Sequence, residues 1–151
     1  MGNNSIINSL KRLERVGNET SRVTAKLKTA CNEVAKKIVE IMKSKCEDAK
    51  KDYYPGEFPQ VQLPRGYRVI LIDTENDYRW TLIRKTQDEW QDHPYDRSLA
   101  YMPNDMTRGD ALQFAKDISE GLLDEIAEWV EKKKLESEEA LKTIESAKEN
   151  L

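Results

Sequence analysis

The sequence is poor in the residues that most often carry catalysis and metal binding. It has one histidine and two cysteines among 151 residues. Its six glycines are scattered, and none belongs to a G-x-G-x-x-G or G-x-x-x-x-G-K-[ST] phosphate-binding loop. The ligand spacing of a structural zinc site is also missing. These absences argue against an enzyme with a familiar active site, and we expect no catalytic residues, no bound metal and no cofactor.

Long apolar runs are missing as well. No stretch approaches the roughly 18–20 apolar residues that are needed to cross a bilayer. The opening MGNNSI has no basic segment followed by an apolar one, which a secretion signal would require. We therefore expect a cytoplasmic protein with no membrane contact.

Basic charge is not in excess. The chain has 25 Lys and Arg against 28 Asp and Glu, a net charge of −3. Sequence-independent binding to duplex nucleic acid depends on many cationic contacts to phosphates, so we do not expect that partner. Charged residues nevertheless make up 35% of the chain, which is typical of long helices with a large surface per residue.

Residues 1–52 predict an N-terminal helical arm. Proline is absent from this segment, and apolar residues recur every three or four positions, which is the spacing of a coiled-coil seam. The series consists of Leu13, Val16, Thr20, Val23, Leu27, Ala30, Val34, Ile38 and Ile41. Glycine costs about 1 kcal/mol relative to alanine inside a helix, so we expect a kink or a break at Gly17.

Residues 53–106 predict a β-rich head. Three prolines and two glycines make residues 53–66 an irregular connector. Two β-branched and aromatic segments, 67–72 and 78–85, flank a polar turn and predict a β-hairpin. An isolated hairpin is only marginally stable, so a third strand is expected, best placed at 98–102. The polar segment 87–97 between them is expected to form a loop.

Residues 107–151 predict a C-terminal helical arm. Thr107 and Asp110 have the spacing of a capping box, and apolar residues then follow at helical intervals as far as Val130. Three consecutive lysines, 132–134, suit a helix C-terminus, where the backbone dipole favours cations. We expect an interruption near Lys134 and a last short helix from Ser137.

Together these elements predict an α+β fold and a single structural unit. Two long antiparallel helical arms, coiled-coil-like, would flank a small antiparallel head made of a β-hairpin or three strands. A two-helix seam buries little apolar surface on its own, so we expect a homo-oligomer, most simply a dimer.

Arginine and aromatic residues gather in the predicted head. Guanidinium groups bind phosphates in a bidentate manner and aromatic faces stack on bases, so a nucleotide-like or phosphorylated ligand is one candidate for this region. Arg and Trp side chains also serve as anchors for protein partners, and aromatics in a small head can simply form its core. The candidate binding residues are Arg79, Trp80, Arg84, Trp90, His93, Tyr95 and Arg97.

Three functional hypotheses follow. The first is a non-catalytic interaction or adaptor protein, which self-associates through the arms and binds a protein partner through the head. The second is a binding or sequestering protein for a small anionic ligand, which would use the Arg and aromatic residues of the head. The third, a hydrolase or transferase with an unfamiliar acidic site, has no motif in its favour.

Overall fold

A computed structural model describes residues 2–49, 60–74, 77–87, 94–99 and 106–151, and shows an α+β fold. Helix α1 spans Gly2–Ala49 and is followed by strand β1 at Gln60–Gln62 and the short 3₁₀ helix η2 at Pro64–Gly66. The other strands are β2 at Tyr67–Thr74, β3 at Asp77–Gln87 and β4 at Pro94–Ser98. Helices α2, Arg108–Ser119, and α3, Leu122–Glu149, complete the chain. The predicted class, with a long helix at each end and an antiparallel sheet between them, is confirmed.

The strands form an antiparallel sheet in the order β1-β2-β3-β4. The predicted hairpin is confirmed as β2 and β3, which pair from Tyr67 with Arg84 to Thr74 with Asp77. The prediction missed β1, which lies in the expected irregular connector and pairs Val61 with Val69. Strand β1 is at the edge of the sheet and pairs only with β2. The prolines of the connector do not prevent this pairing, because they lie outside the three paired residues Gln60–Gln62.

The third predicted strand is misplaced. Strand β4 begins at Pro94, inside the expected loop, and pairs Ser98 with Ile83. Proline has no N–H to donate, but this costs nothing at the first residue of a strand at the sheet edge. The Leu99 N–H then donates to the carbonyl of Leu82 at 2.8 Å, which continues the contact by one residue. The remainder of the predicted segment lies outside the described residues.

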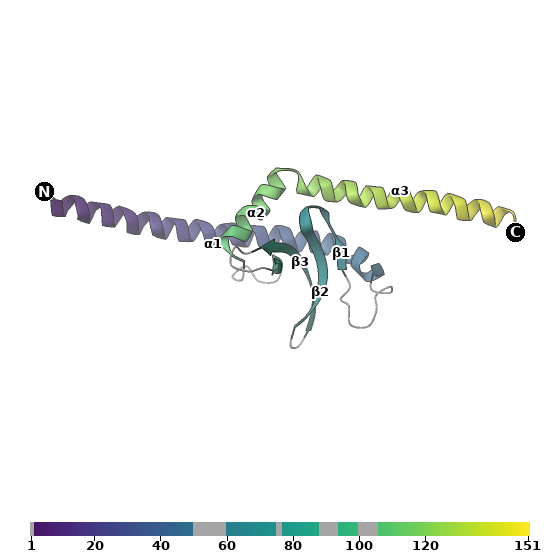
Figure 1. Cartoon of the computed structure of the whole chain (residues 1–151), viewed down its shortest axis with the longest axis horizontal. Helices are drawn as coiled ribbons and strands as arrows, with labels where there is room; N and C mark the ends of the chain where they lie inside the picture. Colours follow the sequence, from purple (N-terminus) through teal and green to yellow (C-terminus); the bar gives the residue numbers. More distant parts are fainter. Residues whose placement is uncertain (1, 50–59, 75–76, 88–93, 100–105) are drawn as a thin grey trace.

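The core lies where the second half of α1 crosses the sheet and α2 (Figure 1). It combines α1 residues (Cys31, Ala35, Ile38, Val39, Met42), head residues (Val61, Leu63, Tyr67, Val69, Leu82, Leu99, Met106) and residues of α2 and α3 (Ala111, Phe114, Leu122, Ile126). A buried polar contact supplements this packing, since the side-chain amide of Asn32 donates to the carbonyl of Leu99 at 2.8 Å. The head therefore holds only part of each long helix.

The breaks in the helices differ from those expected. Helix α1 continues through Gly17, and α3 continues through Lys134 and Ser137. A single residue of low helix propensity, such as Gly17, costs about 1 kcal/mol, and the residues of high helix propensity on either side outweigh that cost. The chain turns instead at Gly121, which has φ 106° and ψ 21°, and the Gly121 N–H donates to the carbonyl of Ile118 at 3.2 Å. A glycine with positive φ just past a helix end is the usual way to stop a helix.

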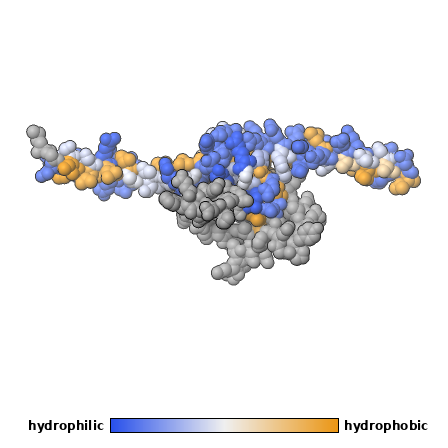
Figure 2. Space-filling view, in the orientation of Figure 1, coloured by the Kyte–Doolittle hydropathy of each residue, from blue (hydrophilic) through white to orange (hydrophobic). Residues whose placement is uncertain are grey.

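The two long helices leave the head on opposite sides, and the chain termini lie at opposite ends of the molecule (Figure 1). Within one chain they therefore do not pair as the expected antiparallel hairpin of arms. Every residue from 3 to 23 and from 131 to 151 is exposed. Apolar residues remain visible along both extensions (Figure 2). We call residues 3–30 the N-terminal arm and residues 131–149 the C-terminal arm.

Candidate functional site

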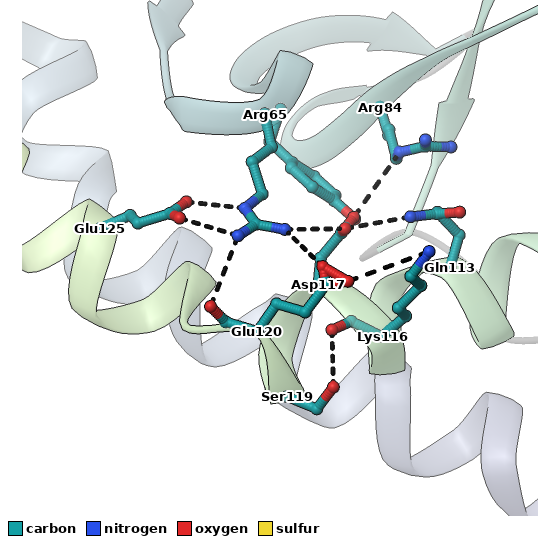
Figure 3. Close-up of polar contacts among 9 residues, drawn as sticks. Arg65, Arg84, Gln113, Lys116, Asp117, Ser119, Glu120 and Glu125 are labelled. Carbon is teal, nitrogen blue, oxygen red and sulfur yellow. Dashed lines mark hydrogen bonds and ion pairs between the residues drawn. The ribbon is translucent and has the colours of Figure 1, made fainter.

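A cluster of charged side chains joins η2 to the turn between α2 and α3 (Figure 3). Its centre is Arg65, whose backbone has φ 62° and ψ 26°, in the left-handed region that costs a residue other than glycine roughly 1–3 kcal/mol. Arg65 donates from Nε and Nη2 to the two carboxylate oxygens of Glu125, both at 2.8 Å. Its Nη1 donates to Glu120 Oε2 at 3.2 Å and to Asp117 Oδ1 at 3.5 Å. The unusual backbone conformation thus aims one guanidinium at three carboxylates.

Asp117 is the buried member of this cluster, with 5% of its surface exposed. It accepts a hydrogen bond from the Tyr67 hydroxyl at 2.5 Å and another from Gln113 Nε2 at 3.0 Å. Nε of Arg84 lies 3.8 Å from Asp117 Oδ2 and has no hydrogen-bond partner among the described residues. A buried carboxylate requires such partners, because burial without them costs several kcal/mol.

The pKa shifts in this cluster follow from the same contacts. Hydrogen bonds from Arg65 lower the pKa of Glu125. The carboxylates of Glu125 and Glu120 raise the pKa of Arg65 in return. Burial, and then the hydrogen bond to Asp117, raise the pKa of Tyr67. Each shift favours the state that the contacts require: a carboxylate, a guanidinium and a neutral phenol.

The cluster is suited to holding α2 and α3 against the head, and less suited to chemistry. The acceptors around Arg65 are side chains of the same chain, so its charge is already compensated. Within the described part of the chain, no group of three or more His, Cys, Asp or Glu residues is arranged to hold a metal ion. The buried thiol of Cys31 donates to the carbonyl of Ala111 at 3.6 Å, and burial raises its pKa, which disfavours the nucleophilic thiolate.

The structure describes the side chains of two of the predicted binding residues, Trp80 and Arg84. Trp80 of β3 is half-buried and packs against the core, and Arg84, also of β3, joins the cluster at Asp117. The structure describes only the backbone at Arg79 of β3 and at Tyr95 and Arg97 of β4. In the strand register, Arg97 is opposite Arg84. Trp90 and His93 lie outside the described residues.

Sequence reasoning missed Arg65, Tyr67 and Asp117 as members of one cluster. The helical neighbours Gln113 and Glu120 of Asp117 are polar. A partial signal was available for Asp117, because it lies beside the face that carries the apolar Phe114 and Ile118. An acidic residue beside such a face predicts a buried partner. Nothing in the sequence identified Arg65 as that partner, since the two residues are 52 positions apart.

The second candidate site is the apolar surface of the two arms. On α1, Leu10 and Leu13 are 58% and 67% exposed, and on α3, Leu141 and Ile144 are 55% and 59% exposed. A shallow groove of about 320 Å³ lies where the N-terminal arm meets α2. Its lining consists of Val16, Glu19, Thr20, Val23, Thr24, Leu27, Arg108 and Leu112. Isolated exposed leucines need no explanation, but a row of them along a helix marks an interaction surface.

No helix within the described residues is both long enough and apolar enough to cross a membrane. Comparison of the chain with protein-family models, with curated proteins and with solved structures finds no match. The functional argument therefore depends on the residues described above.

Proposed function

We propose that the protein is a non-catalytic cytoplasmic interaction protein that self-associates through its two helical arms. The observation that supports this proposal is the exposed apolar surface of the arms, which extend beyond the core that the described residues form in the head. Burying a large apolar side chain contributes about 1.5–3 kcal/mol, so several of them together can offset the entropy lost on association. The compensated charges of the Arg65 cluster, in turn, supply no nucleophile or metal site.

The head remains the proposed contact for a further protein partner. Trp80 and Arg84 are residue types that anchor protein interfaces, and β4 is at an edge of the sheet. The alternative, a small anionic ligand, has less support among the described residues, because Arg65 is engaged by carboxylates and Arg84 lies beside Asp117.

The proposal predicts that polar substitutions on the arms weaken self-association without unfolding the chain. In one variant, Leu10→Gln and Leu13→Gln change α1; in another, Leu141→Gln and Ile144→Gln change α3. Each should raise the dissociation constant of the oligomer at least about a hundredfold in sedimentation analysis, because several kcal/mol of apolar burial is lost. Circular dichroism should show unchanged helix content and melting of the head.

Leu135→Gln is the matched control. Leu135 is also exposed on α3, but it is nine positions from Ile144, or two and a half helical turns, and so lies on the opposite side of the helix. Its substitution should leave the dissociation constant unchanged. An equal effect of all the variants, or a wild-type chain that stays monomeric at every concentration, would contradict the proposal.

A further inference from the structure

The exposed face of the N-terminal arm continues the face of α1 that the head buries. Positions seven apart lie on nearly the same side of a helix. Counting back from Ile38 and Cys31, both buried in the core, such steps reach Thr24, Gly17 and finally the exposed Leu10. On a straight helix this stripe drifts by about 20° per step, so it winds slowly around α1; the head covers its second half, and its first half is exposed.

The C-terminal arm repeats this arrangement. From the buried Ile126, alternating steps of four and three residues pass through Val130, which packs against the core, and then through the polar Lys133 and Ser137, and reach Ala140 and Ile144 on the arm. Ile144 is exposed although it shares a side with Ile126. Each arm thus extends a packing face past the edge of its own head, where none of the described residues of the same chain covers it.

The arms carry opposite charge. Residues 3–30 hold six basic and two acidic residues, a net charge of +4. The C-terminal arm, residues 131–149, holds five basic and six acidic residues, a net charge of −1; its outer part, residues 135–149, holds two basic and five acidic residues, a net charge of −3. Pairing two N-terminal arms, or two C-terminal arms, would bring like charges together, whereas pairing one with the other brings opposite charges together.

We propose that the partner of each N-terminal arm is the C-terminal arm of a second copy of this chain, in a closed two-fold dimer. The proposal rests on the self-association proposed above and specifies which surfaces meet. The arms leave the head on opposite sides. A two-fold axis beside the head therefore places α3 of the second copy along α1 of the first, and it also places α1 of the second copy along α3 of the first.

The directions and lengths of the helices fit this arrangement. Helix α1 runs toward the head and α3 runs away from it, so the two-fold places them antiparallel, with their dipoles opposed. At 1.5 Å per residue, the N-terminal arm is roughly 43 Å long and the C-terminal arm roughly 28 Å, so the second lies within the first. The groove between α1 and α2, with Arg108 at its rim, forms the head end of the same surface.

Charge reversal tests this pairing in the full-length chain. One variant carries Arg12→Glu, Arg15→Glu and Arg22→Glu; a second carries Glu138→Lys, Glu145→Lys and Glu149→Lys; a third carries all six changes. Each single-arm variant places like charges on the paired arms, so its dimer dissociation constant should rise at least tenfold in sedimentation analysis. The six-residue variant restores opposite charges and should return to within about threefold of the wild type.

The matched control carries Lys36→Glu, Lys37→Glu and Lys43→Glu. These residues are exposed on α1 beside the head, outside the N-terminal arm, and their substitution changes the net charge by the same amount as the first variant. It should leave the dissociation constant unchanged.

The outcomes separate this pairing from self-association itself. Loss of the dimer in both single-arm variants with recovery in the combined variant supports the pairing of unlike arms. If the wild type is a dimer and all three variants match it, self-association stands and the pairing is overturned. A wild-type mass that grows beyond two copies with concentration overturns the closed dimer in favour of an open chain of copies. A monomeric wild type overturns both proposals.

Discussion

At the scale of single residues, Asp117 holds together parts of the chain that are distant in sequence. It accepts from Tyr67 and Gln113 and faces the guanidinium groups of Arg65 and Arg84. Removing a buried acceptor costs more than the hydrogen bonds it made, because its partners keep their desolvation penalty. The cluster is therefore a point where a small change should have a large effect on stability.

Asp117→Ala should lower the free energy of unfolding by about 3 kcal/mol, since it leaves the buried Tyr67 hydroxyl and the Arg84 guanidinium without the carboxylate that they face. Chemical denaturation measures this change. Glu128→Ala removes an exposed acidic residue of α3 as a control and should change the free energy by less than about 0.5 kcal/mol. Equal effects of the two substitutions would show that the cluster does not hold the head to the helices.

Tyr67 gives a second residue-scale prediction, which concerns pH. Because burial raises its pKa, the folded chain keeps this phenol proton when an unfolded tyrosine, with a pKa near 10, has lost it. The unfolded state then binds fewer protons, so stability is full below about pH 10 and falls as pH rises beyond it.

Phenolate absorbance measures this behaviour. Of the six tyrosines, Tyr67 should ionise only as the chain unfolds, and Tyr67→Phe should remove that late step while the others titrate unchanged. Ionisation of Tyr67 in the folded protein at the pH of an unfolded tyrosine would argue against its contact with Asp117.

At the scale of elements, Gly17 and Gly121 have opposite roles. Gly121 has φ 106° and ends α2, whereas Gly17 lies inside α1, and neither would place an added Cβ within 4 Å of another atom. A substitution at either position therefore acts through the backbone and not through a clash.

Gly121→Ala should lower the free energy of unfolding by about 1–2 kcal/mol, because an L-residue is strained in the left-handed region. Gly17→Ala should raise it by about 0.5–1 kcal/mol, because alanine favours a helix interior. Thermal or chemical unfolding of the two variants measures both signs. A stabilising Gly121→Ala would mean that α2 and α3 can join into one helix.

Elements that depend on interactions within a short segment of sequence were predicted well, and those that depend on contacts between distant segments were not. The long helices and the β2–β3 hairpin follow from apolar spacing and turn residues within each segment, so the sequence predicted them. The stop at Gly121 is set by the packing of α2 and α3 on the head, which no local pattern shows. Helix α1 continues through Gly17 because the helix-favouring residues on either side outweigh the cost of one glycine, so the local penalty misplaced that break. Strand β4 depends on pairing with β3, which allows a proline at its first residue.

The candidate site was harder to predict than the fold. Arg84 was among the predicted residues, but its contact with Asp117 links β3 to α2, and Arg65 reaches Asp117 from η2. Such contacts appear only when the chain is folded, because no spacing rule relates residues from different elements. The apolar periodicity of the arms, by contrast, was visible in the sequence. The predicted seam on α1 nevertheless includes Val34 and Ile41, which the head leaves exposed, because the head packs on the face that carries Cys31, Ala35 and Met42.

At the scale of the whole molecule, the chain is a small head with two arms that it leaves uncovered. The head fixes the angle at which each arm departs, through the core, the Arg65 cluster and the turn at Gly121. We propose that the exposed apolar residues and the opposite charges of the arms determine what they bind. In this account the antiparallel pairing expected within one chain forms between two chains instead.

The mass of the unmodified protein in solution, measured by sedimentation equilibrium over a range of concentrations, tests this account most directly. It predicts a species of twice the 17.5 kDa chain mass, which dissociates on dilution without loss of helix content. A single species of 17.5 kDa at every concentration, with the helices intact, would contradict it.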